Sequence, residues 1–178
     1  MGRNSYSSYS SYSSYETIEF DGEYNGDKKW NGNVKKYYDK KLQFEGTLFY
    51  GEINGPGNEY YEDIRLKYEG AYLNGKRNGQ GKEYYDNGKL KFEGEYINEE
   101  KNGPGKEYDS EGRLIFEGKY IDGRKNGLGK EYDSEGKLLF DGEYLEDMKW
   151  NGKAKEFYSN GYLKFEGDYI SGKKIDQK

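Results

Sequence analysis

The stretch Leu90-Lys-Phe-Glu-Gly-Glu-Tyr96 decides the fold of this chain. Leu90, Phe92 and Tyr96 share one parity with Gly94, whereas the charged residues between them share the other. This alternation is typical of a β-strand with one buried and one exposed face. The remainder of the fold follows from how often the stretch returns.

The core of the stretch, an aromatic residue followed by an acidic residue and glycine, recurs along almost the whole sequence. Successive copies are 24 residues apart until the last step, which is 25. The aromatic residues of these copies are Phe20, Phe44, Tyr68, Phe92, Phe116, Phe140 and Phe165. Self-similarity at such a period identifies a repeat protein, in which each unit packs only on its neighbours. We therefore expect a long surface and not a pocket.

The second half of each unit predicts another strand. Asn102-Gly-Pro-Gly-Lys-Glu-Tyr108 reads as a glycine-opened strand, and Asp109-Ser-Glu-Gly112 reads as the turn after it. Each unit is thus a β-hairpin, and one hairpin cannot bury enough surface to be stable alone. We predict an all-β, elongated, single-layer solenoid of stacked antiparallel hairpins, one per repeat, twisted or curved.

Glycine recurs inside the first strand of the units, where it weakens a strand unless something must approach closely. We expect aromatic rings from neighbouring units to cover these glycines. The stack should also align two aromatic columns. The first holds Tyr72, Tyr96, Tyr120, Tyr144 and Tyr169, and the second holds Tyr84, Tyr108, Tyr132 and Phe157.

Composition excludes several classes of function. The 178 residues include no cysteine and no histidine, and the net charge is −5. Disulfides, zinc sites with cysteine or histidine ligands, and histidine-based triads are therefore unavailable, so we expect neither an enzyme nor a metal or cofactor. A net acidic chain also lacks the positive field of a nucleic-acid binder. Without a membrane-spanning run or a secretory signal, we expect a cytoplasmic protein that could lie against a membrane.

The ends of the chain differ from the repeats. Residues 1–15 form a Ser/Tyr-rich low-complexity tail, in which tyrosine returns every three residues from Ser5 to Tyr15. Residues 16–172 form the repeat array, and residues 173–178 are expected to be a C-terminal tail. On this prediction Phe165–Ile170 is the first strand of a hairpin whose second strand is missing. The open edge could accept another chain, so homodimerisation is a further expectation.

The repeats resemble MORN repeats. The aromatic-Glu-Gly-x-aromatic opening is matched by Tyr68-Glu-Gly-Ala-Tyr72, the middle by Asn74-Gly-Lys-Arg-Asn-Gly-Gln-Gly81, and the close by Asp86-Asn-Gly88. The resemblance covers about Ile18 to Gly172, in about six and a half units. It implies a groove-forming sheet of hairpins that serves as a scaffold or assembly module, sometimes beside membranes.

The departures from the usual MORN pattern point to a variant of it. The family's usual unit is one residue shorter, and its second strand carries an aromatic residue where this chain has Glu83, Glu107, Glu131 and Glu156. This form resembles the MORN-variant repeats of some bacterial antitoxin-like proteins, so a toxin neutraliser is a special case of the scaffold hypothesis. The stretch Tyr108-Asp-Ser-Glu-Gly-Arg-Leu114 also resembles a YD repeat. The YD-repeat pattern does not contain the Phe-Glu-Gly sequence that recurs here, which argues against that alternative.

Two surfaces are candidates for binding. The first is the aromatic face, Tyr72, Tyr96, Tyr120, Tyr144, Tyr169, Tyr84, Tyr108 and Tyr132, which would receive an extended segment of a protein partner. The second is a row of basic turns for anionic lipid head groups, at Lys28, Lys29, Lys76, Arg77, Arg124, Lys125 and Lys149. Acidic residues interrupt this row, and turn charges are usually only solvated.

The leading hypothesis is a non-catalytic protein-interaction scaffold, and the alternative is a peripheral membrane adaptor.

Three local features could be more than scaffold. Trp30 and Trp150 occupy the same one-residue insertion, and each ring either anchors a partner or covers the adjacent turn. The stretch Phe44–Tyr50 has extra apolar residues, which mark a partner site or a bulged register. The carboxylates of Asp109-Ser-Glu-Gly112 recur in other units and lack calcium-loop spacing, so turn formation explains them best.

Overall fold

The chain forms one open sheet of fourteen antiparallel strands, whose order in the sheet is their order in the sequence. The computed structural model describes residues 15–176, and no helix occurs among them. The predicted fold class is confirmed. The N-terminal tail that the sequence predicts lies outside the described residues, apart from Tyr15.

The strands pair as seven successive hairpins. Their bounds are β1 Glu16–Asn25, β2 Lys28–Tyr38, β3 Lys41–Phe49, β4 Glu52–Tyr60, β5 Leu66–Leu73, β6 Lys76–Tyr84, β7 Leu90–Ile97, β8 Glu100–Tyr108, β9 Leu114–Ile121, β10 Arg124–Tyr132, β11 Leu138–Leu145, β12 Met148–Phe157, β13 Leu163–Ile170 and β14 Lys173–Asp176.

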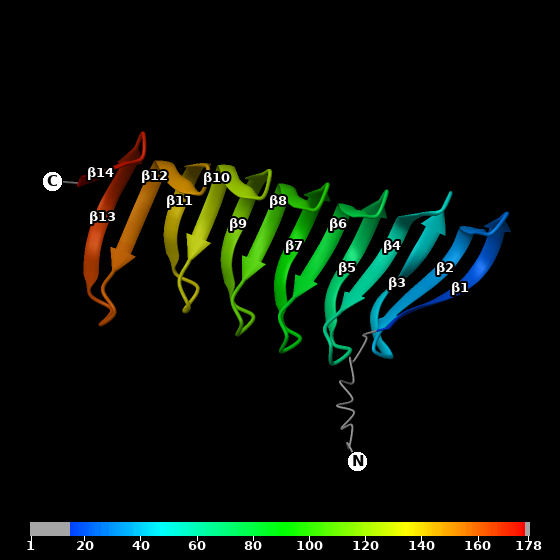
Figure 1. Ribbon diagram of the computed structural model, residues 1–178. Coiled ribbons are helices and arrows are strands. Elements are labelled where there is room, and N and C mark those ends of the chain that lie inside the picture. Colours follow the sequence, from blue (N-terminus) through cyan, green and yellow to red (C-terminus); the bar gives the residue numbers. More distant parts are fainter. Residues whose placement is uncertain (1–14, 177–178) are drawn as a thin grey trace, which may run out of the picture.

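The short turns inside the hairpins line up along one edge of the sheet, which we call the turn edge (Figure 1). Each turn is tied to the preceding hairpin by one backbone hydrogen bond. The amide of Gly75 donates to the carbonyl of Ile53 at 2.9 Å, and the amide of Gly123 donates to that of Lys101 at the same distance. One such bond per repeat holds consecutive units in register along this edge.

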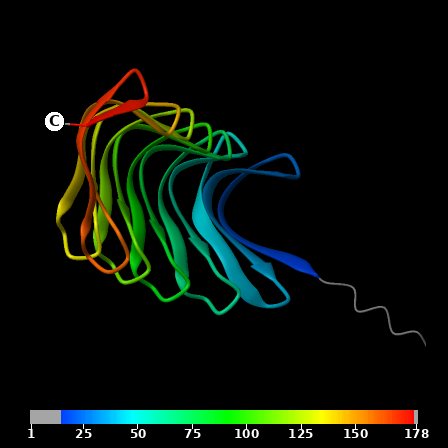
Figure 2. The same ribbon diagram turned by 90° about the vertical axis from the view of Figure 1, so that its left-hand side faces the viewer.

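The strands are bent (Figure 2), and the buried aromatic residues of each strand lie on one side of the sheet. Phe92 and Tyr96 are four residues apart in β7, which is about 13 Å in a flat strand, yet their ring centroids lie 5.5 Å apart. The Tyr120 ring of the next hairpin lies 5.4 Å from Phe92, edge to face. This pattern repeats from Phe44 to Tyr169 as an unbroken chain of rings. We call this side of the sheet the ring face.

The glycines of the first strands are covered, but not as the sequence predicted. An added Cβ at Gly94 would lie 2.7 Å from Cζ of Phe92, which belongs to the same strand. A neighbouring unit reaches only the paired glycine of the second strand, since Tyr120 Cε2 would lie 3.3 Å from a Cβ at Gly105. The prediction of rings from neighbouring units was wrong for the first strands, because the bend folds each ring back over its own strand.

The C-terminal segment was also predicted wrongly. Lys173–Asp176 is the strand β14, which pairs with β13 from Ile170↔Lys173 to Gly167↔Asp176. Phe165–Ile170 therefore has the partner strand that the sequence did not predict. Backbone pairing needs no aromatic side chain, so the lack of a second-strand motif in this segment was misleading.

Candidate interaction surface

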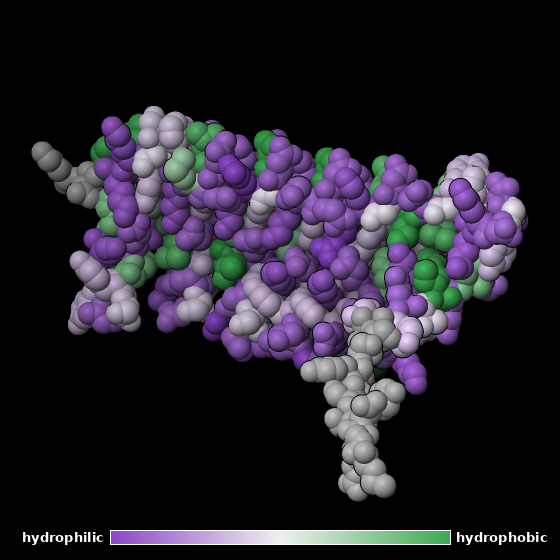
Figure 3. Space-filling model, viewed as in Figure 1, coloured by the Kyte–Doolittle hydropathy of each residue, from purple (hydrophilic) through white to green (hydrophobic). Residues whose placement is uncertain are grey.

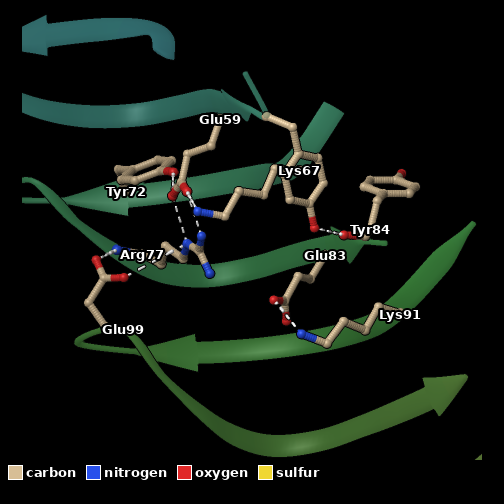
Figure 4. A network of polar contacts seen from close by, with 9 residues as sticks. Glu59, Lys67, Tyr72, Arg77, Glu83, Tyr84, Lys91 and Glu99 are labelled. Atoms are coloured by element: carbon tan, nitrogen blue, oxygen red, sulfur yellow. Dashed lines mark hydrogen bonds and ion pairs between the residues drawn. The ribbon is translucent and has the colours of Figure 1, made fainter. Parts of the chain in front are cut away.

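A layer of cations and carboxylates covers the rings of the ring face (Figure 4). The guanidinium carbon of Arg77 lies 4.1 Å from the centroid of the Tyr68 ring, and Nη2 of Arg77 donates to Oε2 of Glu59 at 2.6 Å. The hydroxyl of Tyr72 donates to the same carboxylate at 2.7 Å. Arg77 therefore stacks on one hairpin and bonds to the hairpin before it.

Lysines take the place of Arg77 in later repeats. Lys125 Nζ lies 4.1 Å from the centroid of Phe116, and Lys149 Nζ lies 5.4 Å from that of Phe140. Each also reaches a glutamate of the preceding repeat, Lys125 at 3.3 Å from Glu107 and Lys149 at 3.2 Å from Glu131. The layer thus repeats along the array, with a cation above a ring and beside a carboxylate.

This layer closes the first candidate surface. Tyr72, Tyr96, Tyr120 and Tyr144 are buried members of the core, and Tyr169 packs against it half-buried. A partner cannot reach these rings without removing the ion pairs above them. The prediction that they form an accessible aromatic face was wrong, because the sequence pattern gives their side of the sheet but not what lies over it.

Two carboxylates of this layer, those of Glu59 and Glu107, are held in their charged form. Burial alone would raise the pKa of Glu59, but the hydrogen bonds from Arg77 and Tyr72 outweigh burial and hold the pKa below its usual value. The pKa of Glu107 is also lowered. Burial alone would raise this pKa, but the ammonium groups of Lys101 and Lys125 outweigh burial. These two carboxylates are therefore charged at neutral pH, beside the cations that they bind.

The second aromatic column lies elsewhere. The hydroxyls of Tyr84, Tyr108 and Tyr132 donate to the carboxylates of Glu69, Glu93 and Glu117 at distances of 2.6–2.7 Å. Burial and the bond to Glu69 raise the pKa of Tyr84 to about 12. These three tyrosines are half-buried, and their hydroxyls point to the side of the sheet opposite the ring face.

That opposite side, which we call the groove face, carries a long open groove. Its main section has a volume of about 1050 Å³ and runs from β4 to β11, and a second section of about 580 Å³ extends it to β1. The two sections share Pro56, Gly57 and Asn58. Glycine pairs such as Gly94 with Gly105 line the groove, and one residue per hairpin stands beside them: Pro56, Gln80, Pro104 and Leu128.

Charges of alternating sign cross the groove in a ladder. Lys106 pairs across the backbone with Glu93 on one side and with Glu117 on the other. The same alternation holds along the row Glu69, Lys82, Glu93, Lys106, Glu117, Lys130 and Asp141. Because each lysine is flanked by two carboxylates, the groove presents polar groups without a strong net field.

The residues of the predicted row of basic turns lie in two different places in the structure. Arg77, Lys125 and Lys149 belong to the layer over the rings and are paired with glutamates. Lys28, Lys76 and Arg124 are exposed, but the exposed residue that opens each second strand alternates along the edge: Lys28, Glu52, Lys76, Glu100, Arg124, Met148 and Lys173. Lys29 is half-buried. Acidic residues interrupt the row in the structure, as the sequence indicated, and binding of anionic head groups by the basic turns stays a prediction.

The turn edge instead carries an exposed apolar row that sequence reasoning missed. The last residue of each first strand is large and apolar from the second hairpin onward, with exposed fractions between 38% and 56%. Figure 3 shows hydrophobic side chains recurring at intervals along this edge. The row consists of Phe49, Leu73, Ile97, Ile121, Leu145 and Ile170. From the second hairpin onward, an apolar residue directly precedes each turn at the repeat period, and this pattern in the sequence could have predicted the row.

The tryptophans cover turns. Cε3 of Trp150 would lie 3.3 Å from a Cβ at Gly172 in the next turn, and Trp30 packs against Tyr50 with ring centroids 5.3 Å apart. Both tryptophans are half-buried. Of the two alternatives, the covering role is the one observed.

The unusual second unit has no extra bulge. Its register shifts between Gly46 and Leu48, as that of the third unit does between Gly70 and Tyr72. Its additional apolar residues are exposed at the turn edge, where Phe49 and Tyr50 lie with ring centroids 4.2 Å apart. The partner-site alternative for this unit stays a prediction.

The loop carboxylates form turns. Oδ1 of Asp109 accepts the amides of Glu111 and Arg113, both at 2.9 Å, and Asp133 does the same for Glu135 and Lys137. Among residues 15–176, no group of acidic side chains is arranged to hold a metal ion. The described part of the chain also contains no helix of the length and apolar character that a membrane span requires.

Three segments of the chain match the family described as MORN repeat variant. They are residues 77–98, 125–146 and 150–171, each of which begins within the second strand of one hairpin and ends just after the first strand of the next. A search of curated proteins gave no match. The matched segments lie in a sheet whose remaining hairpins have the same strand pairing.

Proposed function

We propose that this chain, three segments of which match the MORN repeat variant, is a non-catalytic scaffold that binds an extended segment of another protein along the groove face. Repeats of this kind are generally interaction modules without catalytic activity. The groove is the observation that carries the proposal, because it is continuous from β1 to β11 and its lining repeats with each hairpin.

The groove offers what an extended segment needs. The glycines that line the groove have no side chain and so allow close approach, the residues Pro104 and Leu128 give apolar contact, and the charge ladder gives polar partners at each strand. Leu128 is 70% exposed in the groove, near its end at β11, where an apolar side chain gains nothing from the fold itself. By contrast, the ring face is occupied by its own ion pairs.

Affinity capture with the groove variant Leu128→Glu tests the proposal. This change places a charge in the groove and leaves the core untouched, so it should abolish capture of the partner that the unchanged chain retains. Ile121→Ser in the same hairpin, on the turn edge, is the matched control and should leave capture intact. Equal capture by the unchanged chain and Leu128→Glu, with both variants folded by circular dichroism, would reject the groove as the binding surface.

The peripheral membrane alternative stays a prediction that no observation favours. Three of its seven basic residues are paired over the core, and Glu52, Glu100 and the uncharged Met148 interrupt the exposed basic residues of the turn edge. Flotation with vesicles containing anionic lipid at low salt would measure it directly.

A further inference from the structure

The exposed apolar row of the turn edge carries a pattern of charge that no part of the proposed function uses. Each apolar residue that ends a first strand pairs across the turn with the residue that opens the second strand, as Ile97 does with Glu100. Residues paired in this way point to the same side of a hairpin, so each apolar side chain has its cross-strand neighbour beside it. From the second hairpin to the seventh, the pairs are Phe49 with Glu52, Leu73 with Lys76, Ile97 with Glu100, Ile121 with Arg124, Leu145 with Met148 and Ile170 with Lys173. All of these residues are exposed.

The sign of the neighbouring charge alternates from one hairpin to the next. Glu52 is followed by Lys76, Glu100 and Arg124, and after the uncharged Met148 the row ends with Lys173. An anionic membrane does not match this order, because Glu52 and Glu100 would face the lipid head groups. A surface that matches it carries the same alternation displaced by one hairpin, and a second copy of the chain provides such a surface.

Symmetry limits how two such rows can meet. Two copies that pair through the same surface are related by a two-fold axis. An axis parallel to the row would place every hairpin opposite itself, and thus Glu100 opposite Glu100 and Arg124 opposite Arg124. An axis perpendicular to the row reverses one copy, and like charges are then kept apart only when the axis passes between two hairpins.

An axis between the fourth and fifth hairpins pairs all members of the row. Ile97 then lies opposite Ile121 of the second copy, and Glu100 lies opposite Arg124. The outer positions follow the same order, with Phe49 opposite Ile170, Glu52 opposite Lys173, Leu73 opposite Leu145 and Lys76 opposite Met148. In this register no residue that opens a second strand meets one of like charge.

Most carboxylates of the turns themselves are bound within their own copy. Oε1 of Glu99 accepts the amide of Arg77 at 2.6 Å, and Oδ1 of Asp147 accepts the amide of Lys125 at 2.8 Å. Nη1 of Arg124 donates to Oε2 of Glu146 at 3.1 Å. A guanidinium has five N–H donors, so Arg124 retains donors for a carboxylate of the second copy.

The row is about 48 Å long, since its six hairpins span five steps of about 9.6 Å. A strip of this length and one layer of side chains wide lies at the low end of protein interfaces, whose standard size is about 800 Å² per partner. The dimer is therefore expected to be weak, with a dissociation constant in the micromolar range.

We propose that the chain forms a two-fold symmetric dimer through its turn edges, with the axis between the fourth and fifth hairpins. Burial of the apolar row against its own copy stabilises the dimer, and the alternating charges fix the register. This interface differs from the strand edge at which the sequence predicted homodimerisation. The apolar residues of the row are not among those that line the groove, so the inference does not depend on the proposed function.

Charge reversal tests the register in sedimentation equilibrium of the full-length chain. Glu100→Arg faces Arg124 of the second copy, and Arg124→Glu faces Glu100, so each variant should dimerise about tenfold more weakly than the unchanged chain. An equimolar mixture of the two variants should regain dimers, because each contact then joins an arginine to a glutamate. Lys130→Glu, in the same hairpin as Arg124 but on the groove face, is the matched control and should dimerise normally. A mixture that dimerises no better than its components would refute this register.

Spin-label distances measure the same register with the charges unchanged. The chain has no cysteine, so Asn74→Cys and Ser171→Cys each create a single labelling site, in the turns of the third and seventh hairpins. The two labels of a dimer should lie about 29 Å apart for Asn74→Cys and about 48 Å apart for Ser171→Cys, which are three and five hairpin steps. Short distances at both sites, or a chain that stays monomeric up to about 1 mM, would overturn the proposal.

Ile97→Ser separates the dimer from other occupants of the row. It should weaken dimerisation about tenfold and leave capture of the groove partner intact. If the chain is monomeric and Ile97→Ser instead lowers flotation with lipid vesicles or capture of a protein, the row binds a membrane or that protein and the dimer is refuted. Failure of the groove proposal has a different readout, the insensitivity of capture to Leu128→Glu.

Discussion

Lys125 and Glu107 join neighbouring hairpins above the aromatic core, with Nζ of Lys125 3.3 Å from Oε2 of Glu107. The other carboxylate oxygen of Glu107 accepts from Lys101 at 2.7 Å, within its own strand. Both lysines also stand over rings, Lys101 over Phe92 and Lys125 over Phe116, at 4.2 Å and 4.1 Å. One carboxylate thus holds two cations, each above a different ring. Its bond to Lys101 stabilises the bend of β8, and its bond to Lys125 stabilises the contact between neighbouring hairpins.

Glu107→Gln should therefore lower the free energy of unfolding by about 1–3 kcal/mol, because two partly buried lysines lose their counter-charge. The matched control is Glu135→Gln, which removes an exposed pair with Lys137 and should cost about 0.5 kcal/mol or less. Urea unfolding followed by circular dichroism measures both. Equal effects of the two substitutions would contradict a structural role for the layer.

Because of the same layer, the free energy of unfolding should decrease at acidic pH. The pKa values of Glu59 and Glu107 are lowered in the folded chain, so their contribution is fully present above the unfolded value of about 4.3 and is lost as pH falls through the folded value. The difference in unfolding free energy between the unchanged chain and Glu107→Gln should be largest at pH 7 and shrink below about pH 4. A difference independent of pH would show that the charge of Glu107 is not what stabilises the fold.

Tyr68→Phe should raise the free energy of unfolding by about 1 kcal/mol. The hydroxyl of Tyr68 is buried without a hydrogen-bond partner, and burial raises its pKa to about 12. The equivalent residue of the other repeats is phenylalanine. Tyr72→Phe is the control, since it removes the 2.7 Å bond to Glu59 and should lower the free energy by about 1–3 kcal/mol. Destabilisation by Tyr68→Phe in thermal or urea unfolding would contradict this assignment.

Gly118→Ala should cost about 3 kcal/mol or more through overpacking. A Cβ at Gly118 would lie 2.6 Å from Cα of Gly129 in the paired strand and 2.6 Å from Cζ of Phe116, so the two strands would have to separate. Gly136→Ala is the comparison, because its Cβ meets open space and only its positive φ of 80° opposes alanine, at about 1 kcal/mol. If denaturant unfolding showed a larger loss of unfolding free energy for Gly136→Ala than for Gly118→Ala, the close approach of the strands would not explain why Gly118 must be glycine.

Removal of one whole repeat should shorten the array without unfolding it. Deletion of residues 90–113 removes 24 residues, namely β7, β8 and the loop after them, and joins Lys89 to Leu114 in the same register. Each repeat contacts only its neighbours, so the remaining hairpins should stay folded with lower stability. Deletion of residues 90–101 alone should abolish the fold, because it reverses strand direction. Circular dichroism and small-angle scattering distinguish a shorter ribbon from an unfolded chain.

Much of the fold could be predicted because its causes are local. The alternation of Phe92 and Tyr96 with charged neighbours gives the strand, Asp109 to Gly112 gives the turn, and the 24-residue period gives the stack. The strand β14 was missed because it is held by backbone bonds to β13 and has no side-chain signature. The apolar row at the turn edge could have been predicted from Leu73 and Ile97, since both precede a turn at the repeat period.

What the sequence determined by itself is the repeating hairpin and the side of the sheet on which each side chain lies, since alternation in a strand needs no distant contact. Only the tertiary structure decided which side is accessible. The bend of the strands brings Lys101 to Glu107, and stacking brings Lys125 to the same carboxylate, so the tyrosine column is closed and the glycine-lined groove on the other side remains open. These contacts join residues 6 and 18 positions apart, and they depend on curvature that no local pattern encodes.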